Sequence, residues 1–377
     1  MLTVEKVDTY DKSQVKRFVQ FYYDLYKKCP QWVPPLLTDS YHPLNRKKHP
    51  FFAHSVADFF IAVQAGKIVG RICAAENKPF NEYHKAKKAQ FYFFDSIDNI
   101  EVAKVLFETV FDWARARGLD TVVGPKGLSP FEGGGALIKG FEQRQMMTMT
   151  NYNYDYYPKL IEALGFEKEV DFVSCYLPAE SFRIPERIER IAQRVKERGN
   201  LKIKKFKSKQ ELVRWAPKIG EAYNRAFIDN WSYYPFSNSD VQYAVDNVFL
   251  AADHRLIKII THGDEIVGFL FAFPDVSAAL QRAKGHLFPF GIFDLLLEVK
   301  RTKTISANGM GILPEYQGIG GNALLYYEMG KTIFNFNQFT HVEMTQVAET
   351  TQQMRADLKN LNGVEYKSHR VYRKSIE

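Results

Sequence analysis

The sequence predicts an α/β (α+β) protein that consists of two related domains in tandem. Its 377 residues, 46% of them hydrophobic and 15% aromatic, are more than one typical core needs. Glycines also recur at a constant offset of 198 residues, from Gly70 to Gly268 and from Gly165 to Gly363. A repeat of this length indicates a duplicated domain rather than a short solenoid unit.

The elements follow the same order in both halves. Each half begins with a short strand and an aromatic helix, FVQFYYDLY in the first and PKIGEAYNRAF in the second, and a hairpin follows. Each half closes with a helix, a glycine and a late strand. We therefore expect domains at residues 1–180 and 201–377, joined by a helical linker at 181–200 whose apolar residues form a narrow stripe on a charged background.

Composition excludes several classes of protein. The three cysteines, Cys29, Cys73 and Cys175, are far apart and form no CxxC pair, so neither a disulfide framework nor a zinc site is expected. The nine histidines form no HExxH or HxH motif, so no metal is expected. No window approaches the roughly 20 apolar residues of a membrane span, and the start resembles no signal peptide. We expect a cytoplasmic protein.

The net charge of +8 is spread evenly along the chain. Residues 1–200 contain 29 lysines and arginines against 25 acidic residues, and residues 201–377 contain 22 against 18. Each half therefore has a charge of +4, which argues against a dedicated nucleic-acid arm and suits an anionic small molecule. The sequence contains no indication of an oligomeric state.

The most informative segment is GILPEYQGIGGNALLYYEM, residues 311–329. It predicts a strand that ends before Pro314, a glycine turn, and a helix that begins near Asn322. Glycines at 318, 320 and 321 let the backbone approach a ligand closely. The unpaired N–H groups at the start of a helix attract a phosphate. The alternative is a generic glycine-rich turn.

This segment resembles the coenzyme A motif of the GNAT acyltransferase superfamily, in which a strand leads into a Gln/Arg-x-x-Gly-x-Gly/Ala turn. Gln317 and Gly320 match the pattern, whereas Asn322 stands where the pattern has Gly or Ala. The resemblance extends over most of the chain and points to a bacterial tandem-GNAT family of about 380 residues. It implies two GNAT-like domains, each a mixed, mostly antiparallel twisted sheet flanked by helices.

The resemblance also implies a co-substrate and the residues that hold it. The co-substrate is acetyl-CoA or another acyl-CoA, with no metal. The backbone of Ile312 and Leu313 would pair with the pantetheine arm. The pyrophosphate would be held by Gln317, Gly318, Ile319, Gly320, Gly321 and Asn322.

The equivalent segment of the first half, FYFFDSIDNIEVAKVLF, contains no glycine. Asp98 is expected to cap the helix that follows, and Glu101 adds a negative charge to its first turn. Both carboxylates would repel a pyrophosphate. We therefore expect the first half to be degenerate and the acyl-CoA site to lie in the second half.

Catalytic residues are less clearly marked. By resemblance, the strand HVEMTQVAE flanks the acceptor amine, so Glu343 is the candidate base; a solvent-facing Glu343 is the alternative. The tyrosine that often serves as the acid is replaced by Lys359. Tyr372, in the last strand, is the candidate acid, with a packing role as the alternative.

Two insertions interrupt the repeat, at residues 124–147 and 276–303. The first is rich in glycine but has no GKS/T ending, so we interpret it as turns or as a wall of the acceptor pocket. The second contains HLFPFGIFDLLLEVKRTK, residues 286–303. We expect its apolar side chains to be buried against the core; a membrane surface or an acyl-chain cover are the alternatives.

These features predict an N-acyltransferase of the EC 2.3.1 class that moves an acetyl or other acyl group from acyl-CoA to the amine of an acceptor. One alternative is an aminoacyl or peptidyl transferase that takes its acyl group from charged tRNA. Another is a non-enzymatic CoA-binding sensor, which the lysine at position 359 favours.

Overall fold

The computed structural model describes residues 1–129, 132–147, 150–178, 184–248 and 252–376. Its contacts divide the chain into two compact units. The first unit comprises Met1–Phe172, Leu280–Gly291 and Lys367–Glu377, and the second comprises Val173–Ala279 and Ile292–Tyr366. The predicted boundary between 180 and 181 lies outside the described residues, so the division into 1–180, 181–200 and 201–377 stays a prediction.

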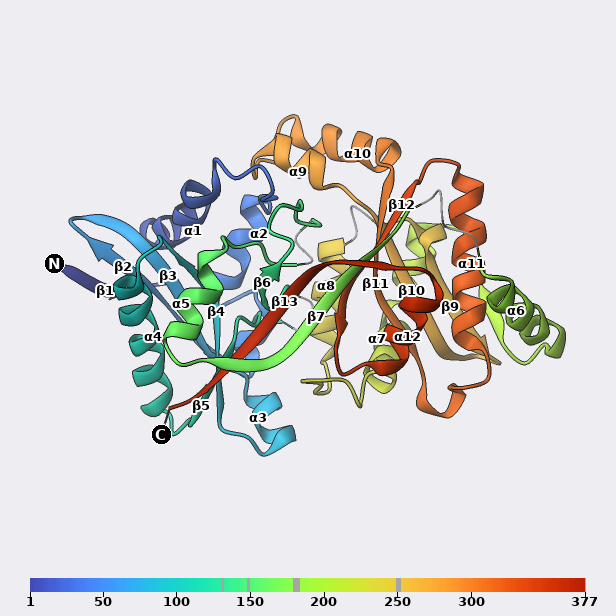
Figure 1. Cartoon of the computed structure of the whole chain (residues 1–377), viewed down its shortest axis with the longest axis horizontal. Coiled ribbons are helices and arrows are strands. Elements are labelled where there is room, and N and C mark those ends of the chain that lie inside the picture. The colour runs from blue at the N-terminus through green and yellow to red at the C-terminus, as the bar shows by residue number, and fades with distance from the viewer. Residues whose placement is uncertain (130–131, 148–149, 179–183, 249–251, 377) are drawn as a thin grey trace. The chain divides into compact units, whose positions relative to one another are not determined.

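The first unit is built on a sheet with the strand order β1-β2-β3-β4-β5-β13, and β6 pairs with β13 (Figure 1). Its neighbouring strands are antiparallel, except for β4 and β5, which are parallel. The strands are β1 (Leu2–Lys6), β2 (Val56–Gln64), β3 (Lys67–Glu76), β4 (Lys88–Ser96), β5 (Thr121–Gly124), β6 (Ala136–Lys139) and the start of β7 (Glu167–Pro178). The helices are α1 (Lys12–Tyr26), α2 (Leu37–Tyr41), α3 (Lys78–His84), α4 (Ile100–Arg115) and α5 (Tyr156–Ala163).

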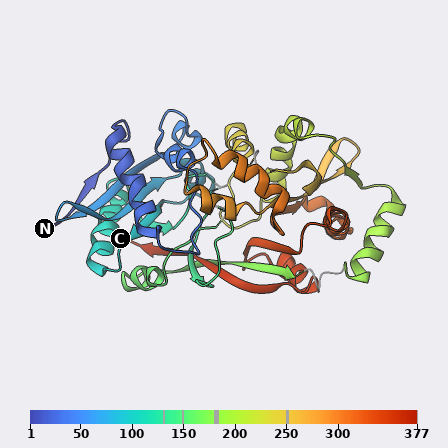
Figure 2. The same cartoon turned by 90° about the horizontal axis from the view of Figure 1, so that it is seen from above.

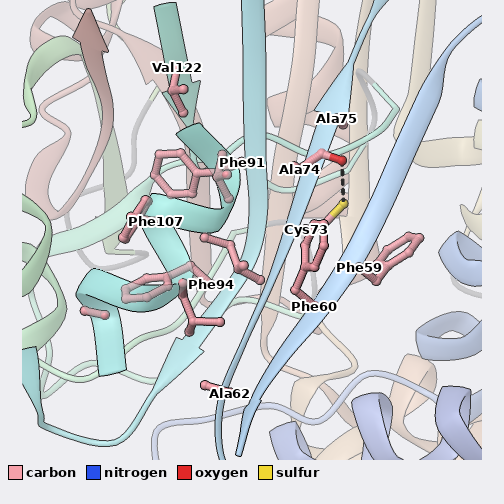
Figure 3. Packing of buried hydrophobic residues seen from close by; sticks show 14 of the residues in the cluster. Phe59, Phe60, Ala62, Cys73, Ala74, Ala75, Phe91, Phe94, Phe107 and Val122 are labelled. Atoms are coloured by element: carbon pink, nitrogen blue, oxygen red, sulfur yellow. Dashed lines mark hydrogen bonds between the residues drawn. The ribbon is translucent and has the colours of Figure 1, made fainter. Parts of the chain in front are cut away.

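Aromatic side chains dominate the core of this unit. Figure 3 shows Phe91 of β4 beside Phe107 of α4, with their ring centroids 5.0 Å apart in an edge-to-face arrangement. Cys73 of β3 is fully buried in the same core, and this burial raises the pKa of its thiol well above the usual value. Cys73 is therefore a packing residue rather than a reactive thiol.

The second unit has the strand order β8-β9-β10-β11-β12-β7. Here β11 and β12 are parallel, whereas the pairs β8–β9, β9–β10 and β10–β11 are antiparallel. The strands are β8 (Lys202–Lys204), β9 (Ile257–His262), β10 (Glu265–Pro274), β11 (Thr304–Ile312) and β12 (His341–Ala348), with the end of β7. The helices are α6 (Glu186–Arg198), α7 (Lys209–Ala226), α8 (Asn238–Val248), α10 (Gly291–Arg301), α11 (Gly321–Phe336) and α12 (Gln352–Asn360); α9 (Ser277–Ala283) leads out of this unit.

Each unit takes its last sheet strand from the other half of the sequence. From Lys367 onward, β13 (Val364–Ser375) belongs to the first unit, where Tyr372 pairs with Gly124 of β5. The end of β7, from Val173, belongs to the second unit and lies beside β12. The sequence predicts both late strands, but nothing in it indicates which sheet each strand joins. The predicted α/β class with mixed sheets flanked by helices is confirmed.

Two glycines of the internal repeat occupy equivalent, crowded places. Gly70 in β3 and Gly268 in β10 each lie on the second strand of a hairpin, beside a register shift. A Cβ atom on Gly70 would lie 2.8 Å from Leu106 Cδ1, and one on Gly268 would lie 2.5 Å from Ile312 Cδ1. Because these distances are too short for carbon atoms in contact, a larger residue at either position would force the neighbouring leucine or isoleucine side chain to move.

The prediction that the apolar insertion is buried is wrong for most of its large side chains. Only Leu295 of α10 is fully covered. The exposed side chains, between 47% and 79% accessible, are Phe288, Phe290, Phe293, Leu296 and Leu297. The helix packs against the rest of the protein through the narrow face that contains Leu295. Periodicity shows that a helix is apolar on its other face as well, but not whether that face is buried or exposed.

Candidate functional site

The turn before α11 has the geometry expected of an anion-binding segment. Gly318 and Gly320 have φ values of +76° and +95°, in the left-handed region that favours glycine. Gly320 is the N-cap residue of α11 and has no side chain to offer, so the first turn has no side-chain cap. In the described structure, no backbone carbonyl accepts from the N–H groups between Gly318 and Ala323. These groups are open to an external acceptor.

The equivalent helix start in the first unit, at α4, is capped by a side chain. The Asn99 side chain accepts a hydrogen bond of 2.9 Å from the N–H of Glu101, and Glu101 adds its charge to the first turn of α4. Asn99 therefore supplies the cap that the sequence analysis assigned to Asp98. The first turn of α11, in contrast, has neither a side-chain cap nor an acidic residue.

Two other elements approach the start of α11. Asp357 of α12 accepts hydrogen bonds from Asn322 Nδ2 at 3.1 Å and from the Tyr326 hydroxyl at 3.2 Å. A Cβ atom on Gly320 would lie 2.7 Å from Val195 Cγ2 of α6. The Asn322 amide is thus bonded to a carboxylate, and no local pattern could indicate this contact because Asp357 lies 35 residues away.

The strand before the turn contains a bulge. Leu270 of β10 pairs with Met310, and Ala272 pairs with Ala307, so two residues of β11, Asn308 and Gly309, lie opposite a single residue of β10. Gly309 has a φ of +105°, a conformation that glycine adopts without strain.

The parallel strands β11 and β12 separate at this bulge. They pair from Thr304 and His341 to Ala307 and Met344, and no pairing continues beyond that point in these fully described strands. In β12, Gln346 has a φ of +57°, so the second strand is irregular as well. Beyond Ala307 and Met344 the two strands therefore form no backbone ladder with each other.

Ile312 directs its backbone groups toward this separation. The N–H of Leu313 donates to Val267 O of β10 at 2.9 Å. Because successive residues of a strand point their backbone groups to opposite sides, those of Ile312 face away from β10. Gln317 Nε2 donates to Ile312 O at 3.3 Å, so this side chain lies over the end of the strand.

Glu343 is buried on β12, with 4% of its surface exposed. It is the register partner of Ser306 on β11, and alternation places it on one face with Thr345. Thr345 Oγ1 and, on β7, Ser174 Oγ are buried without a hydrogen-bond partner in the described structure. This part of the sheet therefore contains two buried hydroxyl groups that no hydrogen bond of the described structure satisfies.

The opposite face of the sheet is apolar. Val342 and Met344 point to it and line a cavity of about 40 Å³. The other lining residues come from β7, β10, β11, α6, α11 and the segments beside them: Leu177, Ile184, Ile188, Leu270, Ala307, Tyr326, Met329, Gly330, Ile333 and Leu361. Glu343 is thus separated from this cavity by the sheet.

Tyr372 belongs to the first unit, whereas Glu343 and the glycine turn belong to the second. Its ring is part of the first unit's core, and its hydroxyl donates to Glu162 Oε1 at 2.9 Å. Burial, and then the contact with Glu162, raise the pKa of Tyr372 well above its usual value. Its role as an acid stays a prediction.

The first unit contains a buried polar pair that sequence reasoning missed. His49 Nε2 lies 3.0 Å from Glu132 Oε1, and Glu132 Oε2 accepts from the N–H of Leu128 at 2.8 Å. The pair joins a short 3₁₀ segment to the insertion that follows β5. Neither residue stands in a motif, so no pattern in the sequence could have linked them.

Within the described residues, no three histidine, cysteine, aspartate or glutamate side chains come together as a possible metal site. In the same part of the chain, no helix combines the length and apolar character that crossing a membrane requires.

The fold of the chain is that of tandem GNAT proteins. A tandem GNAT protein from the clavulanic acid biosynthesis pathway superposes with a TM-score of 0.58 and 11% identity, covering 100% of this chain and 99% of that one. A GCN5-related N-acetyltransferase from Sphaerobacter thermophilus gives a TM-score of 0.51 at 11% identity, with 100% and 96% covered. The predicted GNAT fold is confirmed.

Two relatives match almost the whole chain. A bacterial ceramide synthase from Caulobacter vibrioides is 30% identical over 373 residues, 97% of this chain and 95% of the relative. Protein YghO from Escherichia coli is 27% identical over 374 residues, with 97% and 94% covered. The chain belongs to the protein family of this bacterial ceramide synthase. No protein-family profile matches it.

Proposed function

We propose that the protein is an N-acyltransferase that moves an acyl group from acyl-CoA to an amine, with its site in the second half. The observation that carries this proposal is the separation of β11 and β12 beside an uncapped helix start. The separation offers backbone groups to an extended chain, and the helix start offers N–H groups to a phosphate.

The residues of this region fit an acyl-CoA. The N–H groups from Gly318 to Asn322 would hold the pyrophosphate, and the backbone of Ile312 and Leu313 would lie along the pantetheine arm. Ile312 suits this role because its backbone groups face away from β10. In Leu313 the N–H donates to Val267 O and the carbonyl accepts from the N–H of Tyr316, so these bonds would have to open for Leu313 to pair with the arm. The negative charge of Asp357 would repel the bound pyrophosphate. The side-chain amide of Asn322, which donates to Asp357, would therefore have to donate to the pyrophosphate instead.

The chemistry needs no covalent intermediate on the protein. The nitrogen of a neutral amine attacks the thioester carbonyl, a C–N bond forms, the C–S bond breaks, and the thiolate leaves. Glu343 would accept the proton that the amine loses. Its position supports this role, because Glu343 is buried on β12 opposite Ser306 of β11, close to the point where the two strands separate. Tyr372 remains the proposed donor to the thiolate.

The acceptor is proposed from the family. A ceramide is the amide of a fatty acid with a long-chain amino alcohol, so we propose a long-chain amine as acceptor and a donor with a chain longer than acetyl. The identity of 30% along nearly the whole chain supports this choice.

The test combines binding with product formation. Calorimetry of the purified protein with free CoA, acetyl-CoA and palmitoyl-CoA measures donor binding. Mass spectrometry of reactions with a long-chain amino alcohol, or with a short polar amine, measures the amide. We expect palmitoyl-CoA to bind and the long-chain amide to form. Binding without any amide would favour a CoA sensor, and the absence of binding would contradict an acyl-CoA site.

A further inference from the structure

A cluster of large apolar side chains lies exposed around the start of α10. We name it the α10 patch, and its members are Phe288, Phe290, Phe293, Leu296 and Leu297. They all lie within residues 288–297, so their closeness follows from the chain itself (Figures 1 and 2, orange). Single exposed apolar residues are ordinary, but a contiguous group of this size marks a surface that contacts something.

The helix has two distinct apolar faces. Leu295 packs inward and is 5% exposed. Phe293, Leu296, Leu297 and Lys300 follow the i, i+3, i+4, i+7 spacing, so they share the outward face. The outward face is therefore apolar over its first two turns and ends in a lysine.

Exposed basic residues flank the patch on both sides along the chain. The exposed members are Arg282, Lys284, Lys300, Arg301 and Lys303. The two acidic residues of α10 both face Arg301, which lies 2.9 Å from Asp294 and 3.6 Å from Glu298. The acidic charges are thus compensated within the helix, and the segment keeps a net positive charge.

We propose that the α10 patch docks onto a lipid bilayer surface that carries anionic headgroups. An interfacial helix inserts aromatic and leucine side chains at the level of the headgroups while lysine and arginine contact the phosphates. Polybasic segments beside an apolar face are attracted to such surfaces.

The charges favour a bilayer over a second copy of the chain. A symmetric dimer through this patch would bring two positive rims together, and like charges across an interface are unfavourable. Lysine is also depleted at protein interfaces, whereas it is favoured beside lipid. The docking is independent of the acyl-transfer step.

Sedimentation with vesicles tests the proposal without any activity measurement. The full-length protein is mixed with vesicles of phosphatidylglycerol and phosphatidylethanolamine, or of phosphatidylcholine alone. We expect binding to the anionic vesicles that weakens as salt is raised. Reversing two charges, in Lys300→Glu with Lys303→Glu, should weaken this binding by at least roughly 25-fold, because each basic residue near the surface contributes roughly five-fold.

A second variant tests the apolar part. Phe290→Ser, Phe293→Ser and Leu297→Ser together should abolish sedimentation, while a control with Ile228→Ser and Phe334→Ser, two exposed positions outside the patch, should bind as the wild type does. Light scattering of each protein gives its mass. Equal vesicle binding by all variants would overturn the proposal. A wild-type dimer that becomes a monomer in the triple variant, without vesicle binding, would also overturn it.

Discussion

Single residues at the start of α11 decide whether the turn can hold an anion. Ile319 is exposed, and so is Ile100 at the start of the equivalent helix α4. We expect Ile319→Asp to weaken acyl-CoA binding by roughly tenfold or more, because a carboxylate would lie beside the pyrophosphate. Calorimetry measures the effect, and Ile100→Asp is the matched control, expected to bind normally. Equal loss in both variants would move the site away from α11.

Glu343→Gln tests the proposed base with an isosteric side chain. We expect amide formation to fall by roughly 10²–10⁴-fold, the usual contribution of a positioned base, with acyl-CoA binding unchanged. Glu349→Gln, just beyond the end of β12, is the control. If the rate of Glu343→Gln equals that of the wild type, another group takes the proton.

His369 makes the stability of the first unit depend on pH. Burial lowers the pKa of His369 from 6.5 to about 4, and its Nε2 donates to Asn151 O at 2.9 Å. The unfolded chain binds the proton more readily, so this contribution is complete above pH 6.5 and is lost as the pH falls toward 4. The loss amounts to about 3 kcal/mol at most.

Urea unfolding at pH 7.5 and pH 5 measures the effect. We expect the wild type to lose stability at the lower pH. His369→Gln, which keeps a donor for Asn151 O, should give a flatter pH profile at lower overall stability. An identical pH profile in the two proteins would contradict this explanation.

At the scale of elements, the contact between α6 and α11 is set by the absence of one Cβ atom. Gly320→Ala would place a methyl group 2.7 Å from Val195 Cγ2 and 2.9 Å from Ile191 Cγ2, on a backbone with a φ of +95°. We expect a loss of about 1–3 kcal/mol in the free energy of unfolding. Adding Val195→Ala should recover the steric part, and urea unfolding of the single and double variants measures it. Additive losses would show that α6 moves aside freely.

The local elements could be predicted from the sequence, and their partners could not. Periodicity and glycine spacing located the strand, the turn and the helix around Gly320, since these follow from short-range rules. Alternation gave the face of Glu343, but its burial depends on what covers the sheet. The approach of Asp357 to Asn322 and the exposure of α10 are set by tertiary packing, which no local pattern records.

At the scale of the whole molecule, the last eleven residues stabilise the first unit. A chain that ends at Tyr366 would lose the part of β13 that pairs with β5, and the core would lose Tyr372. We expect residues 1–172 to become sensitive to protease in this truncated chain, because β5 becomes an unprotected sheet edge. Mass spectrometry of the fragments measures the change. A digestion pattern identical to that of the full chain would show that the first unit is stable without β13.

The exchange of late strands also constrains the order of events during synthesis. The N-terminal half emerges from the ribosome long before residues 367–377 are synthesised. The first sheet therefore stays incomplete for nearly the whole time of translation. Its exposed edge is a target for chaperones in that interval. A premature stop near the end of the message would then damage the part of the protein that was made first.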